Sequence, residues 1–247
     1  MKKVKVYDLP TRFFHWSFAG FFLSAFAIAK LADSESTIYP FHMLIGLMLF
    51  SAVTMRILWG ILGSRYARFS SFALNPLALF RYFKEMFPVK PPKSLGHNPA
   101  SSWAALIMMI LALGLAFTGV QMAQGNNKEF YEDFHELFGN AFILVVISHV
   151  AGVILHMILH RDGIAFSMLT GKKTATEGGI ENEKTHKAFG FVYLVVLALW
   201  ALYLGINYDS TQKSLHLFGN KLQLGESEND SEKKSANDSG EYEIDED

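Results

Sequence analysis

Five blocks of predominantly apolar residues limit what this chain can fold into more than any other feature of its sequence. The blocks are residues 13–32, 43–62, 102–123, 137–159 and 188–206. Each has about 20 residues, which is the length that a helix needs to cross the hydrocarbon core of a bilayer. Lipid offers no hydrogen bonds to the backbone, so each block must satisfy its own backbone groups as a helix. The sequence therefore predicts an all-α integral membrane protein, a helical bundle with five transmembrane helices.

The composition agrees with a membrane protein and narrows the metal chemistry that the chain can support. Hydrophobic residues make up 51% of the 247 residues and charged residues only 18%, whereas soluble domains carry about 25% charged residues. The sequence contains no cysteine, which excludes disulfides, iron–sulfur clusters, thiolate zinc sites and covalent attachment of haem. Any metal site must therefore use the nine histidines or the carboxylates.

The distribution of Lys and Arg predicts the orientation of the bundle. Basic residues gather before the first block, between the second and third blocks, and between the fourth and fifth blocks. The connections at 33–41 and 124–134 contain one basic residue between them, Lys128, against five acidic residues. Because basic connections stay in the cytoplasm, we expect a cytoplasmic N-terminus and a C-terminus on the opposite side.

Two segments outside the blocks have a recognisable character. Residues 74–87 place Pro76 at a helix start and surround Arg81 and Lys84 with apolar residues, which fits a short helix in the membrane interface or an ordinary loop helix. After Asn207 the chain has eleven acidic residues against four basic ones. Such a segment has too few apolar groups to offset the entropy of ordering it. Residues 207–247 are therefore expected to form a disordered acidic tail.

Four histidines lie within or at the ends of the apolar blocks, where ionisable side chains are candidates for function. They are His15, His42, His135 and His149. His135 and His149 are 14 residues apart, so they project from nearly one face of a helix, about 21 Å apart along its axis. One helix can therefore contribute a histidine to each of two stacked haems.

The predicted topology pairs these histidines by depth. A b-type haem takes one imidazole on each side of its ring, which in a bundle means one histidine from each of two facing helices. The pairs are His42 with His135 near the outer face, and His15 with His149 further in. His156 matches the depth of His15 better than His149 does, so spacing alone leaves the inner ligand open. Two non-covalent b haems are the predicted cofactors.

Two arginines lie where they could hold haem propionates. Arg56 lies 14 residues beyond His42, on the same face of the second helix, where a buried cation needs a partner. Arg12 precedes His15 by three residues and is either a second clamp or an anchor at the membrane surface. Small residues near the histidines would let a flat macrocycle approach, although helix packing explains them equally well; these are Gly46, Gly60, Gly139 and Gly152. Solvated polar roles are expected for His97, His160, His186 and His216.

Several segments match a known family. They are Val6-Tyr7-Asp8-Leu9-Pro10-Thr11-Arg12 with His15-Trp16, His42 with Gly46, Arg56-Ile57-Leu58-Trp59-Gly60, Ala67-Arg68-Phe69, Gly96-His97-Asn98-Pro99, His135-Glu136, His149-Val150-Ala151-Gly152-Val153 and Met168-Leu169-Thr170-Gly171-Lys172-Lys173. Over about residues 5–175, the chain resembles the bacterial di-haem cytochrome b family that includes the cytochrome b subunits of nickel–iron hydrogenases. The resemblance assigns the haem histidines to the first, second and fourth helices and favours His149 over His156.

The resemblance also implies a function and a division of the chain. It implies a haem domain over residues 1–175. Outside the matched region, hydropathy and charge predict a cytoplasmic loop and fifth transmembrane helix at 176–206 and an acidic periplasmic tail at 207–247. A protein of this kind, in the bacterial inner membrane, would transfer electrons between the quinone pool and a redox partner. That partner would be a periplasmic cytochrome c or a dehydrogenase- or hydrogenase-type subunit, and no nucleic acid is expected.

Two alternatives from other classes remain open at the level of sequence. Intramembrane histidines also serve metal or proton transporters, although the apolar blocks contain almost no carboxylates. The chain could instead be a membrane anchor for a peripheral oxidoreductase. With both axial positions of each haem taken by histidine, the main interpretation assigns no catalytic residue, only electron transfer and quinone redox chemistry.

Overall fold

The computed structural model describes residues 2–85, 97–160, 164–175 and 182–225. Five helices in this part of the chain are long and apolar enough to cross a membrane. They are α1 (Leu9–Leu31), α2 (Pro40–Leu62), α4 (Pro99–Ala123), α5 (Lys128–His160) and α7 (Lys187–Ile206). The predicted all-α membrane bundle with five transmembrane helices is confirmed, and α5 begins nine residues before its apolar block because the polar residues ahead of the block are also helical.

The starts of α1 and α4 are encoded locally. Asp8 accepts a hydrogen bond from the backbone N–H of Thr11 at 3.0 Å, and Asn98 accepts one from that of Ser101 at 2.7 Å. Each cap is followed by a proline in the first turn, where the missing N–H costs nothing. Both helices therefore begin at positions that are set by residues next to them in sequence.

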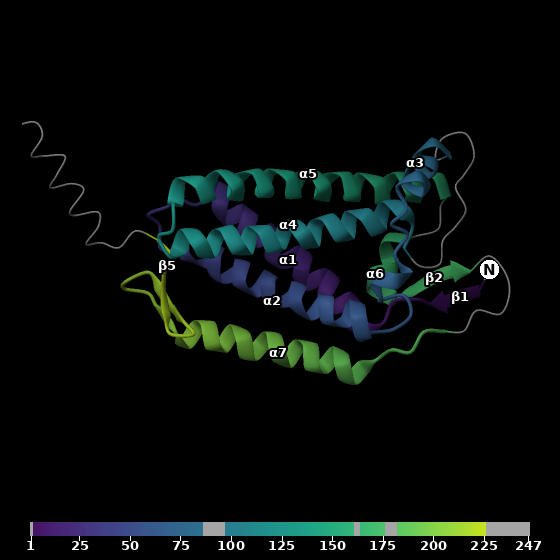
Figure 1. The fold of residues 1–247 in the computed structure, drawn as a ribbon. Helices are drawn as coiled ribbons and strands as arrows, with labels where there is room; N and C mark the ends of the chain where they lie inside the picture. Colours follow the sequence, from purple (N-terminus) through teal and green to yellow (C-terminus); the bar gives the residue numbers. More distant parts are fainter. Residues whose placement is uncertain (1, 86–96, 161–163, 176–181, 226–247) are drawn as a thin grey trace, which may run out of the picture.

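The long helices lie side by side, α4 against α5 and α1 against α2, with α2 also touching α4. The fifth helix, α7, packs on α1 and α2, on the side away from α4 and α5 (Figure 1). Large apolar side chains on α5 and α7 remain exposed, as expected for surfaces that face lipid. The fifth helix is therefore an addition to the four-helix core and does not separate its members.

The end predicted to be cytoplasmic is closed by two segments far apart in sequence. Strand β1 (Lys2–Lys5) pairs antiparallel with β2 (Lys172–Ala175). Between α2 and α4 lie η1 (Phe69–Ser71) and α3 (Pro76–Glu85), and after α5 lie η2 (Ile164–Phe166) and α6 (Ser167–Thr170). The exposed apolar side chains of α3 fit the expected interfacial helix, whose last two expected residues lie outside the described part.

The opposite end carries a small sheet that the sequence interpretation did not predict. Strands β3 (Tyr208–Asp209), β4 (Ser214–Leu217) and β5 (Asn220–Gln223) form an antiparallel meander, at the end of the molecule opposite β1 and β2 (Figure 1). The expectation of disorder from residue 207 is therefore wrong for residues 208–224. Three leucines of this segment are buried against α2, α4 and α7; they are Leu215, Leu222 and Leu224. This apolar contact stabilises the sheet, although the segment as a whole is polar.

Candidate haem sites

The outer histidine pair meets across the bundle. His42, in the first turn of α2, and His135, in the second turn of α5, have ring centroids 5.9 Å apart and ring planes at 70°. Two imidazoles that share one metal ion, each with a metal–nitrogen distance of about 2 Å, place their ring centres about 6 Å apart. The structure thus brings together two side chains that are 93 positions apart in the sequence. The distance between their rings suits two ligands of one iron.

Hydrogen bonds determine which nitrogen of each outer imidazole is available. His42 Nδ1 lies 2.8 Å from the carbonyl oxygen of Ala25, which can only accept, so Nδ1 carries the proton. His135 Nδ1 lies 2.8 Å from Thr118 Oγ1, and that hydroxyl already donates to the carbonyl of Gly114 at 2.9 Å. The hydroxyl therefore accepts from Nδ1. With the proton on Nδ1, Nε2 of each ring has a free lone pair, which is the atom that a histidine offers to a metal.

The inner pair is less closely assembled. His15 on α1 and His149 on α5 interact electrostatically, and both are half-buried, but among the described residues they make no ring contact with each other. His156, the alternative inner ligand, is buried with 9% of its surface exposed. The structure does not choose between His149 and His156, and the assignment of His149 as the inner ligand stays a prediction.

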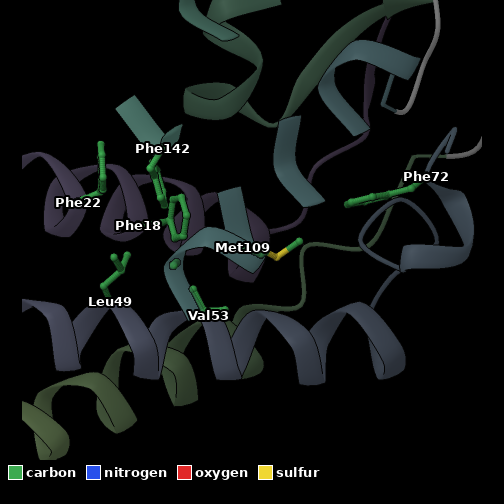
Figure 2. Close-up of a cluster of buried hydrophobic side chains, with 8 residues drawn as sticks. Phe18, Phe22, Leu49, Val53, Phe72, Met109 and Phe142 are labelled. Atoms are coloured by element: carbon green, nitrogen blue, oxygen red, sulfur yellow. The ribbon is translucent and has the colours of Figure 1, made fainter. Parts of the chain in front are cut away.

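An aromatic layer separates the two histidine levels. Phe142 is fully buried and lies seven residues from both His135 and His149 on α5. Figure 2 shows its ring beside those of Phe18 and Phe22 from α1, with centroid distances of 5.7 and 3.8 Å. The same cluster contains residues from α2, α4 and the loop before α3, namely Leu49, Val53, Met109, Ala112 and Phe72. Packed side chains therefore fill the middle of the bundle, between the level of His42 and His135 and the level of His15 and His149.

Arg56 is the buried cation that the sequence predicted at the inner level. Only 4% of its surface is exposed, and its guanidinium carbon lies 5.1 Å from the centre of the Phe69 ring. One nitrogen, Nη2, donates to the carbonyl of Ala67 at 2.9 Å. The other, Nη1, is enclosed and has no hydrogen-bond partner among the described residues. An unpaired donor on a buried cation fits an anionic group such as a haem propionate.

Arg12 has a contact that the sequence did not predict. Its guanidinium donates to the backbone carbonyls of Met168 and Leu169, near the end of α6, where helix carbonyls carry partial negative charge. Trp16 donates to the same Met168 carbonyl at 3.2 Å. These bonds attach α1 to the segment after α5. Neither role predicted for Arg12, surface anchor or propionate clamp, is tested by these contacts, and both stay predictions.

The glycines near the histidines divide into two groups. A Cβ atom at Gly46 or Gly152 would have no neighbouring atom within 4 Å, so the backbone is open there to a flat group. At Gly139 the nearest atom would be one of Leu115 at 4.0 Å, whereas at Gly60 a side chain would collide with the Phe69 ring. Packing accounts for Gly60, whereas no described atom packs against the α-carbon of Gly46 or Gly152.

His97 is the residue that sequence reasoning missed. We expected it to be solvated, but its ring packs on Phe72 at 4.7 Å and on the buried Tyr7 at 5.6 Å, and its Nδ1 is enclosed. Burial, with smaller effects of the charges on Lys173 and Arg56, lowers the pKa of His97 to about 3. His97 immediately precedes Asn98, the N-cap of α4, and this position next to a fixed helix start was the feature of the sequence that could have indicated its burial.

The other three histidines expected to be solvated lie in different surroundings. His186 packs on Trp59 at 5.4 Å, and His216 is exposed on β4. The side chain of His160 lies outside the described part.

The donor set fits a haem of the b type. Over residues 2–85, 97–160, 164–175 and 182–225, no group of three or more His, Asp or Glu side chains is placed to hold a metal ion, whereas His42 and His135 meet as a pair. Such a pair of imidazoles between apolar helices would supply two nitrogen ligands to a haem iron, and the buried Arg56 at the inner level would supply a counter-charge there. A membrane bundle with these features belongs to the class of b-type cytochromes.

Comparison with known proteins identifies the family. The model of the family described as prokaryotic cytochrome b561 matches residues 6–171, more than half of the chain. The chain therefore belongs to the prokaryotic cytochrome b561 family, which confirms the resemblance seen in the sequence. It is a multi-pass membrane protein of electron transfer that binds b-type haem. Neither curated proteins nor solved structures gave a match.

Proposed function

We propose that the chain binds two non-covalent b haems and carries electrons through the bacterial inner membrane, between the quinone pool and a redox partner. His42 and His135 would hold the outer haem, and His15 and His149 the inner one. The observation that carries this proposal is the contact between His42 and His135, 5.9 Å apart on separate helices. Each ring presents an unprotonated Nε2 for ligation.

The haems, when bound, supply one-electron redox chemistry. The chain's own residues orient and insulate them. Ala25 and Thr118 hold the outer imidazoles in one tautomer, and Phe142 with its neighbours excludes water between the two levels. Arg56 balances negative charge at the inner level. Held by a histidine pair each, the haems would carry electrons and would leave no open coordination site for oxygen or substrate.

The two sites are spaced along the membrane normal. The continuous helix α5 carries both His135 and His149, so their separation follows from the helical rise and is about 21 Å. We infer a cytoplasmic N-terminus, with electrons exchanged between quinone and a periplasmic cytochrome c or a peripheral oxidoreductase subunit.

Optical spectra of the purified chain test this proposal. After expression with haem supplied, dithionite-reduced minus oxidised spectra should show b-type bands, and a quinol analogue in membrane vesicles should reduce the same bands. Replacing His135 with Leu should remove part of the signal, whereas the control His216→Leu, on the exposed face of β4, should leave it unchanged. Absence of b-type bands from the haem-supplied protein would contradict the proposal.

A further inference from the structure

We propose that His97 and Arg56 together form a carboxylate-binding site at the cytoplasmic end of the bundle, and that this site takes a propionate of the inner haem. The inference rests on the proposed function. It adds a positioning residue, His97, that comes from the segment before α4 and lies outside the histidine pairs.

Both residues present an unused hydrogen-bonding atom in a buried place. Nη1 of Arg56 and Nδ1 of His97 are enclosed and have no hydrogen-bond partner within the described ranges. An unpaired buried polar atom is costly, and an unpaired group on a buried cation is more so. Nη1 of Arg56 can only donate, and Nδ1 of His97 donates in one of its two tautomers, so one ligand that accepts hydrogen bonds would satisfy both atoms.

The two side chains converge on one aromatic ring. His97 lies 4.7 Å from the centre of the Phe72 ring, and the guanidinium carbon of Arg56 lies 5.8 Å from the same centre. The two groups also interact electrostatically. Arg56 lies on α2, Phe72 in the loop after η1 and His97 just before α4. Three segments of the chain therefore build one small site.

The site lies at the level of the inner histidine pair. His97 interacts electrostatically with both His15 and His149. If His15 and His149 hold the inner haem, a group bound between His97 and Arg56 would lie near it, and a haem carries its propionates on its own edge. No separate ligand needs to be invoked.

The charge around the site favours an anion. Arg56 and Lys173 both act on His97 as positive charges. The nearby carboxylate, Asp8, is occupied: Oδ1 accepts from the backbone of Thr11 and Oδ2 accepts from the Trp59 indole at 2.9 Å. A carboxylate from the ligand would complete this arrangement with charge-assisted hydrogen bonds.

The experiment uses the full chain with His135→Leu, which leaves the inner haem alone, and follows transfer of haem to apomyoglobin. Adding His97→Leu or Arg56→Met should each speed the loss of inner haem by about tenfold or more, since each removes a hydrogen bond to a charged group. His97→Gln, which keeps a donor, should restore much of the retention. The control is His186→Leu, which removes another ring at the same end, packed on Trp59, and should have no effect.

Redox titration supplies the second readout. Arg56→Met should lower the midpoint potential of the inner haem, because a positive charge near the iron favours the reduced form. In the chain with both haem sites intact, His97→Leu should speed loss of the inner haem and leave the outer haem unchanged. Unchanged inner-haem retention in His97→Leu would overturn the proposal, and so would equal loss from both sites, which would indicate general destabilisation. If the His135→Leu parent binds no haem, the proposed inner haem site itself fails, and that outcome is distinct from failure of His97 alone.

Discussion

The ring of Phe142 stacks on the ring of Phe22, with centroids 3.8 Å apart and planes at 14°. Phe142 lies midway along α5 between His135 and His149, and Phe22 comes from the facing helix α1. The pair joins α1 to α5 between the two histidine levels. It therefore both stabilises the bundle and keeps the two sites apart.

Removal of the Phe142 ring should destabilise the protein markedly. Phe142→Ala leaves a cavity in a fully buried cluster, and such changes cost about 3–5 kcal/mol. Thermal unfolding in detergent measures the loss. The control is Leu144→Ala on the same helix, whose side chain is 64% exposed and faces lipid. A loss of equal size in both variants would contradict the central role of Phe142.

The hydroxyl of Thr118 should matter for the outer haem alone. Thr118→Val keeps the shape of the side chain but removes the acceptor for His135 Nδ1. Loss of a hydrogen bond that orients a metal ligand typically weakens binding about 10- to 100-fold. Haem loss measured by transfer to apomyoglobin should become faster for the outer haem only.

A matched control for Thr118 lies on α2. Thr54 is an exposed threonine whose hydroxyl donates to the carbonyl of Phe50 at 3.0 Å and touches no histidine. Thr54→Val should leave haem retention unchanged. Equal behaviour of the two valine variants would show that Thr118 does not orient His135.

The small sheet at the outer end should depend on Leu215. This side chain is fully buried against the ends of the helices, and its replacement by Ala should cost about 2–5 kcal/mol in the docking of the sheet. Limited proteolysis of proteoliposomes should then cleave within 208–223 faster than in the parent protein. The neighbouring exposed residue provides the control, since His216→Ala should not change the cleavage rate.

The absence of cysteine makes the orientation directly testable. Ser34 and Ser70 are exposed residues on connections at opposite ends of the bundle. A membrane-impermeant maleimide should label Ser34→Cys in intact cells and Ser70→Cys only after permeabilisation. The reverse pattern would invert the topology inferred from the basic residues.

The long helices could be predicted from the sequence because each is determined by its own composition. A block of about 20 apolar residues can only be helical in lipid, and the depth of a histidine in such a helix follows from the helical rise. That reasoning was sufficient to predict the pairing of His42 with His135, which the structure brings into contact.

The missed features depend on contacts between distant segments. β1 pairs with β2, and the partners Lys5 and Lys172 are 167 positions apart in the sequence. No local pattern marks either strand. The burial of His97 depends on Phe72 and Tyr7, which come from other segments. The β4–β5 hairpin turns at Phe218 and Gly219, both with positive φ. Asn, Asp and Gly usually mark the first position of such turns, so Phe218 gave no clear signal of the hairpin.

The ratio of haem to polypeptide in the purified full-length protein counts the histidine pairs that hold a haem. We expect two haems per chain, one in His135→Leu, one in His149→Leu, and two in the His216→Leu control. A parent protein with one haem or none would contradict this expectation, and a His149→Leu variant that keeps both haems would contradict the assignment of the inner ligand.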